Sequence, residues 1–232
     1  FLFFFYSSFI FLACYFRHRF AYIADPAGGQ NAALLIVNLR NGDARRVLEG
    51  HDSVIPEDIE LVIDGTPVQV SDPDGEQRSA RIGVNPIALD SDSEWLYFGP
   101  MHGTSLYRVK TSDLRNSKLS DSDLADRIER FGEKPISDGI VIDENGTIYL
   151  GDLANNAIGK LDSAGNYEIL RADPDLSWID AFALSPDGKV YAVANQLHRS
   201  AALNGDAEST ARPPFLLVRF DPSSSKISIP KR

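Results

Sequence analysis

Three similar segments recur along the chain, and they constrain its fold more than any other feature. They start at Asn85, Asp138 and Asp180 and read NPIALDSDSEWLYFG, DGIVIDENGTIYLGD and DAFALSPDGKVYAVAN. Each one starts with Asn or Asp, continues with apolar residues at alternate positions, and passes through a polar turn into a second apolar run that contains a tyrosine. Alternation with a period of two is typical of a strand with one buried face. The segments are therefore predicted to be repeated β-hairpins.

The spacing of these hairpins predicts the architecture. Their starts lie 53 and 42 residues apart (138 minus 85 and 180 minus 138). Two further strands are expected after the middle hairpin, in AIGKLDSAGNYEIL, and residues 22–48 show the same order of strands and turns. Repeats of this length with about four strands each predict an all-β fold of the β-propeller type, with about four blades in this chain.

The first sixteen residues, FLFFFYSSFIFLACYF, differ from the rest of the chain. A signal peptide carries its positive charge before the apolar run, whereas Arg17 and Arg19 follow it here. The run is also shorter than the roughly 20 apolar residues of a membrane-spanning helix. Residues 1–19 are interpreted as an anomalous apolar segment, either a damaged signal or anchor or a mistaken start, and residues 20–232 as a partial propeller domain. A membrane partner is expected only if residues 1–16 are an authentic anchor.

Composition excludes several classes of function. The formal net charge of -10 and the pI near 4.8 argue against nucleic acid as a partner and favour cations. Cys14 is the only cysteine, so neither an internal disulfide nor a cysteine metal cluster is expected. No G-x-S-x-G motif or glycine-rich phosphate loop occurs in the sequence, which argues against a serine hydrolase and a nucleotide-binding protein.

Three segments interrupt the repeats. Residues 51–82 are interpreted as a long loop around the hairpin ELVIDGTPVQV, and residues 196–214 as a second long loop. The segment SDSDLADRIERF predicts a short helix, because Ser120 and Asp123 fit a capping box and Leu124, Ile128 and Phe131 share one helical face.

Several motifs then resemble a known family. The segments GTSLYRVKTSDLRNSKLSDSDLADRIERFGEKPISDGIVID, YLGDLANNAI, VANQLHR and RPPFLLVRF are similar to the bacterial branch of the major royal jelly protein/Yellow family, over roughly residues 20–222. The resemblance implies a six-bladed β-propeller, secreted or periplasmic, that has a signal peptide when complete and of which this chain is an N-terminally truncated fragment. Insect members are associated with dopachrome conversion, nutrition and the binding of biogenic amines, so the resemblance leaves the activity open.

A more distant resemblance runs to the regucalcin/gluconolactonase propellers, which bind a divalent cation, usually calcium, on the propeller axis. Their Pro-Asp-Gly motif is similar to Ser137-Asp138-Gly139, and their Asn-Gly motif to Asn85-Pro86, where Pro replaces Gly. The glutamate expected near the first blade has no counterpart in this chain.

The repeat itself suggests a site. If Asn85, Asp138 and Asp180 each start an innermost strand, they converge on one mouth of the central channel. Their oxygens suit Ca²⁺ or the ammonium of an amine ligand. The alternative is that each side chain only caps free backbone amides, as Asn and Asp often do at strand starts. Asp25 and Asp152 are interpreted as turn residues.

Aromatic and histidine side chains near the same rim are further candidates. Trp178 could hold an amine through a cation–π contact or could pack between blades. Phe98 and Met101 follow the Asn85 strand, and packing is the preferred interpretation for Phe98 and Trp95. His102 and His198 stand in loops where a general base could lie, but surface positions are expected for both.

Three functions from different classes follow. The leading hypothesis is a propeller that binds a small cationic or aromatic molecule at the channel mouth, through Asn85, Asp138, Asp180 and Trp178. The alternative is a calcium-dependent lactonase or hydrolase, with Asn85, Asp138 and Asp180 as metal ligands and Asp138 as a possible general base. The third is a structural propeller that binds a partner through the loops at 51–82 and 196–214.

Overall fold

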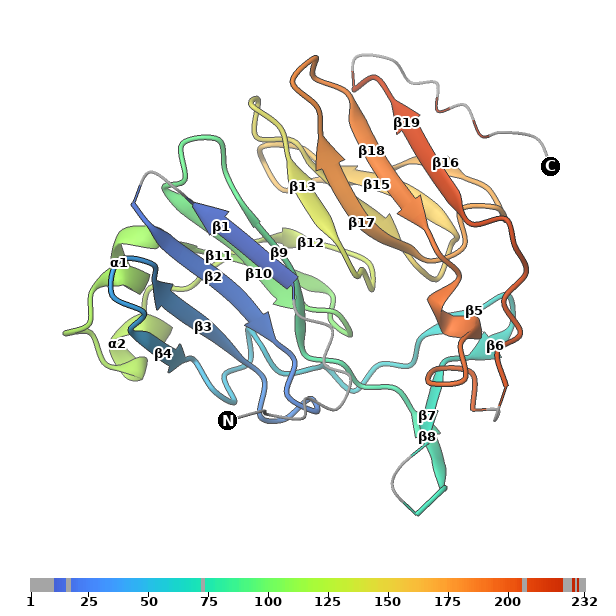
Figure 1. The fold of residues 1–232 in the computed structure, drawn as a ribbon, viewed down its shortest axis with the longest axis horizontal. Coiled ribbons are helices and arrows are strands. Elements are labelled where there is room, and N and C mark those ends of the chain that lie inside the picture. Colours follow the sequence, from blue (N-terminus) through green and yellow to red (C-terminus); the bar gives the residue numbers. More distant parts are fainter. Residues whose placement is uncertain are drawn as a thin grey trace.

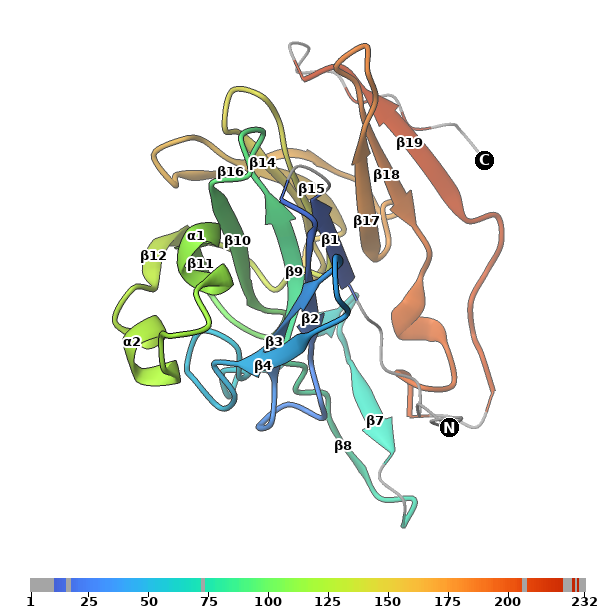
Figure 2. The ribbon, with the colours of Figure 1, turned by 60° about the vertical axis from the view of Figure 1, so that its left-hand side comes forward.

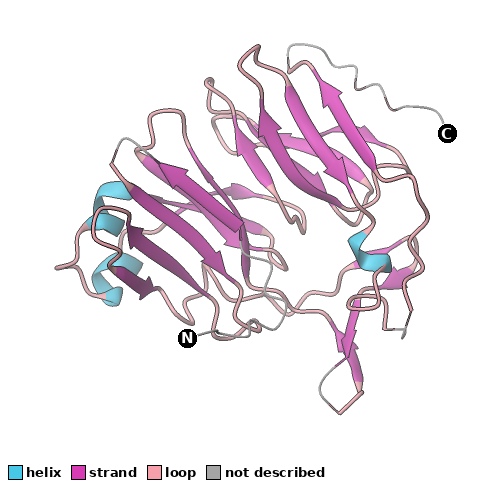
Figure 3. Ribbon diagram, viewed as in Figure 1, coloured by secondary structure: helices cyan, strands magenta, loops and turns pink. Residues whose placement is uncertain are grey.

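The computed structural model describes residues 11–15, 18–71, 74–205, 208–222, 227 and 229, and most of its ordered elements are strands (Figures 1 and 3). Four antiparallel sheets lie side by side. In chain order their strands are β1 (Phe11–Tyr15), β2 (Phe20–Asp25), β3 (Ala33–Asn38) and β4 (Ala44–Val47); β9 (Val84–Leu89), β10 (Trp95–Pro100), β11 (Ser105–Lys110) and β12 (Glu129–Glu133); β13 (Ile140–Ile142), β14 (Ile148–Asp152), β15 (Ala157–Leu161) and β16 (Tyr167–Ala172); β17 (Ile179–Leu184), β18 (Val190–Ala194) and β19 (Leu216–Phe220).

The first strand of each sheet is its innermost strand. Strand β9 lies at the edge of its sheet and contacts both β1 and β13, while β13 also contacts β17. The sheets therefore fan out from a row of neighbouring innermost strands, which is the arrangement of blades in a propeller. The all-β, propeller-type prediction is confirmed at this level.

The turn chemistry of the repeats explains the hairpins. In the turn between β13 and β14, the Asp143 carboxylate accepts hydrogen bonds from the backbone N–H groups of Asn145 and Thr147, both at 2.9 Å. Gly146 has a positive φ of 78° there, which glycine adopts without steric cost. The contacts that close this turn therefore come from residues 143–147 themselves.

Neighbouring sheets pack against each other through equivalent tyrosines. The tyrosine of each hairpin lies on the face that packs against the next sheet: Tyr22 belongs to the core between the first and second sheets, Tyr97 to that between the second and third, and Tyr149 to that between the third and fourth. All three side chains are buried. On the fourth sheet the equivalent face remains uncovered by described residues, with Val193 36% and Leu217 64% exposed.

Strand β1 lies before residue 20, where the propeller domain was expected to start. The sequence predicts that residues 1–19 lie outside the propeller domain, yet Phe11–Tyr15 pairs with β2 along its whole length, with Ala13 opposite Tyr22. The first strand of this sheet thus lies within the apolar run, at the place where the repeat requires a strand. The rest of that run, residues 1–10 and 16, lies outside the described residues.

The helix expected from Ser120 is shorter than predicted. Helix α2 (Asp121–Ala125) has the expected capping box between Ser120 and Asp123. Phe131 is not in the helix but in β12, where it packs edge-on against Tyr97 with 5.0 Å between ring centroids. Pairing with β11 and this aromatic contact override the helical periodicity. A second short helix, α1 (Thr111–Arg115), was not predicted.

The two long insertions meet at one end of the molecule. Residues 51–82 contain the expected hairpin, β5 (Val62–Ile63) and β6 (Thr66–Pro67), and an unexpected one, β7 (Gln69–Ser71) and β8 (Gln77–Ser79). The loop at 196–214 contains the 3₁₀-helix η1 (Leu197–Arg199) and lies beside them, since the Gln69 N–H donates to the Leu203 carbonyl at 3.1 Å (Figure 1).

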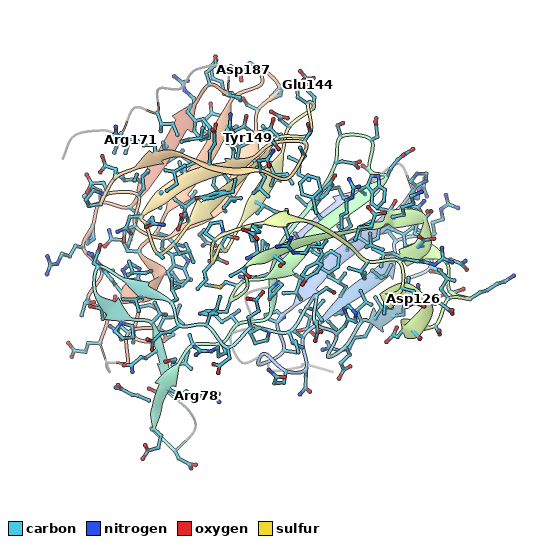
Figure 4. The ribbon with its side chains drawn as sticks, turned by 180° about the vertical axis from the view of Figure 1, so that it is seen from behind. Arg78, Asp126, Glu144, Tyr149, Arg171 and Asp187 are labelled. Atoms are coloured by element: carbon cyan, nitrogen blue, oxygen red, sulfur yellow. The ribbon has the colours of Figure 1, made fainter. Side chains whose placement is uncertain are left out.

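The two hairpin turns that contain Glu144 and Asp187 lie at the end of the molecule opposite to the insertions. Figure 4 shows Arg78, on β8, far from Glu144 and Asp187, which belong to these turns. Figure 2 shows β7 and β8 projecting away from the four sheets. Among the described residues, no helix has both the length and the apolar character needed to cross a bilayer.

Candidate functional site

The structure brings Asn85, Asp138 and Asp180 together. Asn85 is the second residue of β9, Asp138 lies two residues before β13, and Asp180 is the second residue of β17. These strands are consecutive neighbours in the row of innermost strands. The residues therefore meet at the strand starts, at the end of the sheets where both insertions lie (Figure 1).

Gly139 makes this approach possible. A Cβ atom at position 139 would lie 2.0 Å from the carbonyl oxygen of Asp180, a separation that real Cβ atoms do not show. The start of β13 thus touches the backbone of β17 directly, and only glycine fits there. This glycine belongs to the Ser137-Asp138-Gly139 motif noted in the sequence, and its close contact places the Asp138 carboxyl beside that of Asp180.

Asp138 is the centre of the hydrogen-bond network. It is only 2% exposed. Its Oδ1 accepts a hydrogen bond from Nδ2 of Asn85, and its Oδ2 accepts one of 2.6 Å from Nε1 of Trp178. Trp178 directly precedes β17, and its left-handed backbone, with φ at 58°, turns the chain as it enters that strand. Its carbonyl accepts a hydrogen bond from the Asn195 N–H, which ties this turn to the end of β18.

Asp138 and Asp180 form a carboxyl pair that shares a hydrogen bond. Burial raises the pKa of Asp138 well above its usual value, and the neighbouring Asp180 charge raises this pKa further. Burial also raises the pKa of Asp180, but hydrogen bonds from Asp138 and from the Asn195 amide oppose that rise. Asp138 is the more buried of the two, and the upward shift of its pKa is the larger. No described Lys, Arg or His side chain contributes to either pKa shift.

One polar atom at this centre has no partner. Oδ1 of Asn85 is buried and accepts no hydrogen bond from any described residue. The Asn85 amide otherwise contacts Asp138 and, at 3.9 Å, the sulfur of Met101. Burying an amide oxygen without a hydrogen bond costs about 1–3 kcal/mol. Such an atom is therefore well placed to bind a cation or a hydrogen-bond donor from a ligand.

A cavity of about 210 Å³ opens onto these residues, and we call it the site cavity. It is smaller than the roughly 300–1,000 Å³ of pockets for drug-sized ligands. Asp180 does not line it and contacts it only through Asp138. The lining residues are Pro26, Ala27, Gly28, Gly29, Val70, Arg81, Ile82, Asn85, Met101, Asp138, Trp178, Leu197, Ala202 and Leu203.

The expectation that His102 and His198 are surface residues is wrong. His102 is fully buried, and its Nδ1 accepts a hydrogen bond of 3.1 Å from the Ile82 N–H. His198 is half-buried and stacks on the Trp178 ring, with 5.8 Å between centroids and 15° between planes. Burial lowers the pKa of each to about 4, so both rings are neutral at pH 7. The contacts that bury them, with Ile82 for His102 and with Trp178 for His198, come from other segments of the chain and leave no local sequence signal.

The remaining candidates have structural roles. The side chain of Asp25 accepts a hydrogen bond from the Ala27 N–H, and that of Asp152 accepts from Asn155 and from the Tyr167 hydroxyl, as expected of turn residues. Phe98 is buried in the core between the first and second sheets, and Trp95 packs against the core between the second and third. Neither ring lines the site cavity.

Lys134 was not singled out from the sequence. It is almost fully buried, and its Nζ donates hydrogen bonds to the carbonyls of Gly103 at 2.8 Å and Pro135 at 3.1 Å, with a longer one to Met101 at 3.4 Å. Burial lowers the pKa of Lys134 to about 7. It holds the turn after β10, which carries Met101 into the site cavity. A lone lysine before a proline gives no sequence signal for this role.

The described residues contain no cluster of three His, Cys, Asp or Glu side chains suited to a metal ion. A cation at this centre would instead rely on Asn85 together with the Asp138–Asp180 pair. Chemically, the arrangement can bind a cationic group through its oxygen atoms and can enclose an apolar group against Met101 and Trp178.

Comparison with known proteins identifies the relatives of this chain. The family model described as "Major royal jelly protein" matches residues 12–213, so the similarity starts within β1, earlier than the residue 20 expected from the sequence motifs. Major royal jelly protein 1 of Apis mellifera is 31% identical over 90 residues, which cover 37% of this chain and 20% of that protein.

Solved structures with a similar fold are more distant in sequence. A gluconolactonase from Xanthomonas campestris has a TM-score of 0.50 and 12% identity, and the match covers 78% of this chain and 52% of that one. The hydrazine synthase of Kuenenia stuttgartiensis has a TM-score of 0.53 and 13% identity, over 93% of this chain and 46% of that one. This chain thus spans about half the length of these structures and a fifth of the curated relative. At such identities the likeness concerns the fold alone.

Proposed function

Because this chain belongs to the major royal jelly protein family, we propose that it binds a small molecule with a cationic group in the site cavity. The observation that carries the proposal is the buried Asp138–Asp180 pair beside the unpartnered Oδ1 of Asn85. An ammonium group supplies the positive charge that the pair lacks and donates a hydrogen bond to the amide oxygen. The rest of the ligand, aromatic or aliphatic, packs against Met101 and Trp178.

The chain's two tryptophans allow a direct test. In a Trp95→Phe variant all indole fluorescence comes from Trp178, which lines the site cavity. We expect tyramine and phenethylamine to change this emission in a saturable manner, and isothermal titration calorimetry to give the same affinity. The uncharged analogue 2-phenylethanol is expected to bind at least 10-fold more weakly.

Asp138→Asn is the matching variant, because it keeps the shape of the side chain but replaces the carboxyl group by an amide that cannot ionise. We expect it to weaken amine binding by at least 30-fold, or about 2 kcal/mol, as for removal of one partner of a buried charge pair. Asp152→Asn is the control, since Asp152 is equally buried but lies outside the site cavity. Equal binding of amine and alcohol, or an unaffected Asp138→Asn variant, would contradict the proposal.

A second candidate function is a calcium-dependent lactonase or related hydrolase. The unpartnered Asn85 oxygen and the two carboxyl groups fit a hard cation, which prefers oxygen ligands. Asn85, Asp138 and Asp180 would hold the ion, which when bound would polarise a lactone carbonyl. Asp138 would then bind the metal and orient the substrate. This function ranks second because Ca²⁺ takes six to eight oxygens and the cavity walls are mainly apolar.

Metal analysis distinguishes the two functions. Calcium that co-purifies in stoichiometric amount, together with lactone cleavage abolished by EDTA, would support the lactonase. Amine binding that is unchanged by EDTA and by added CaCl₂ would support the first proposal.

The whole protein is proposed to be a six-bladed ring, secreted or periplasmic. The uncovered face around Val193 and Leu217 supports the ring, because the equivalent face of every other sheet is covered by its neighbour. Family membership is the support for the location. Fractionation of cells that express the full-length protein tests the location.

A further inference from the structure

The site cavity has a charged residue besides Asp138. Among its described lining residues only Arg81 and Asp138 are ionisable, and their ionised forms carry opposite charges. Arg81 belongs to the first insertion, directly before Ile82 and β9. A bare amine would neutralise the carboxyl pair but would bring a second cation into a cavity that already contains Arg81.

Arg81 can bind a ligand because its ion pair with Asp58 is weak. Its Nε and Nη2 atoms both donate to Oδ1 of Asp58, at 3.1 and 2.9 Å. The Asp58 side chain is 98% exposed, whereas that of Arg81 is only 29% exposed. Ion pairs with such exposed partners contribute about 0–1 kcal/mol. A ligand carboxylate that accepts both N–H groups through two oxygens can therefore replace Asp58.

A loop that contains Gly29 fixes the position of the Arg81 backbone. Gly29, which also lines the cavity, has a φ of 94°, and a Cβ atom there would lie 3.0 Å from the Arg81 carbonyl oxygen. The loop between β2 and β3 thus packs directly on the Arg81 backbone. This contact holds Arg81 at the rim of the first sheet, while Asp138 is held at the start of the third.

The walls between these two charges are apolar. They are formed by Val70, Ile82, Met101 and Leu203, together with the Trp178 ring. A ligand that spans the cavity therefore needs a short apolar body between its charged ends. The volume of about 210 Å³ limits this body to a few carbon atoms or one small ring.

We propose that the ligand is a small zwitterion, namely an amino acid whose ammonium group lies at Asp138 and whose carboxylate lies at Arg81, joined by a short apolar chain. This inference rests on the proposed function and narrows its ligand class from amines to amino acids with separated charges. Asp138 and Asn85 accept hydrogen bonds from the ammonium group, and the guanidinium of Arg81 takes the carboxylate through two parallel hydrogen bonds.

The test uses three probes with the same carbon chain: 5-aminopentanoate, pentylamine and pentanoate. Calorimetric titration at pH 7 is expected to show that 5-aminopentanoate binds at least 10-fold more tightly than either probe with a single charge. Homologues with three to six carbons then locate the preferred spacing. If pentylamine binds as tightly as 5-aminopentanoate throughout, the zwitterion inference is wrong while the proposed amine site stands. If no amine binds at all, both fail.

Variants of the arginine pair separate the role of Arg81 from that of folding. Arg81→Gln is expected to reduce binding of 5-aminopentanoate to the level of pentylamine. Asp58→Asn, which frees Arg81, is expected to tighten binding of 5-aminopentanoate about 2- to 5-fold. Arg108→Gln is the matched control, because Arg108 pairs with Glu129 and is 30% exposed but lies outside the site cavity. Unchanged 5-aminopentanoate binding in both Arg81→Gln and Asp58→Asn would overturn the inference, whatever their melting temperatures.

Discussion

Replacing Gly139 by alanine tests the contact on which the site depends. The new Cβ atom would lie 2.0 Å from the Asp180 carbonyl oxygen, and the closest separation that Cβ atoms show is about 3.0 Å. The start of β13 must therefore move away from β17 by about 1 Å. A shift of this size stretches the 2.6 Å hydrogen bond between Trp178 and Asp138 beyond the usual limit.

The expected loss of stability follows from these two effects. Overpacking of a core costs about 1–3 kcal/mol, and the lost hydrogen bond about 1 kcal/mol more. For a chain of this size each kcal/mol lowers the melting temperature by about 2–4 °C. We therefore expect Gly139→Ala to melt roughly 4–16 °C below the wild type. Ligand affinity should fall together with stability, since Asp138 moves with Gly139.

The assay follows circular dichroism during heating, and the fluorescence of Trp178 in the Trp95→Phe background. Gly188→Ala is the control, because Gly188 has a φ of 77° and a Cβ atom added there would have no neighbouring atom within 4 Å. It is expected to cost about 1 kcal/mol in backbone strain and to leave ligand binding unchanged. A Gly139→Ala variant that melts and binds like the wild type would refute the claim that this close contact builds the site.

Two other predictions concern Lys134 and the uncovered face of the fourth sheet. Because burial lowers the pKa of Lys134 to about 7, the folded chain binds fewer protons than the unfolded chain between pH 7 and the ordinary lysine value of 10.5. The unfolding free energy of the wild type should thus rise with pH in this window relative to Lys134→Met, by up to about 1.4 kcal/mol per unit. Urea titrations at pH 7, 8 and 9 measure this, with Lys118→Met as an exposed control, and parallel curves would contradict it. Leu217→Lys should reduce concentration-dependent association of this chain in sedimentation velocity, whereas Leu39→Lys, at an exposed turn, should not; equal association of both variants would count against the uncovered face as its cause.

Sequence patterns predicted the structure correctly where it depends on local interactions or on a repeated motif. Alternating apolar residues and turn chemistry placed the hairpins at Asn85, Asp138 and Asp180, and the capping box placed the start of α2. The common phase of the three polar residues also predicted that they would meet, because equivalent positions in repeated sheets share one end of the innermost strands.

Only the tertiary structure determined the contacts between segments that are distant in sequence. The hydrogen bond from Trp178 to Asp138 depends on the packing of β17 beside β13. The burial of His102 and the presence of Arg81 in the site cavity depend on how the first insertion folds over the strand starts. Phe131 lies in β12 rather than in a helix because it pairs with β11 and contacts Tyr97. The periodicity of apolar residues indicates which face of a helix or strand is apolar, but it does not indicate which distant segment covers that face.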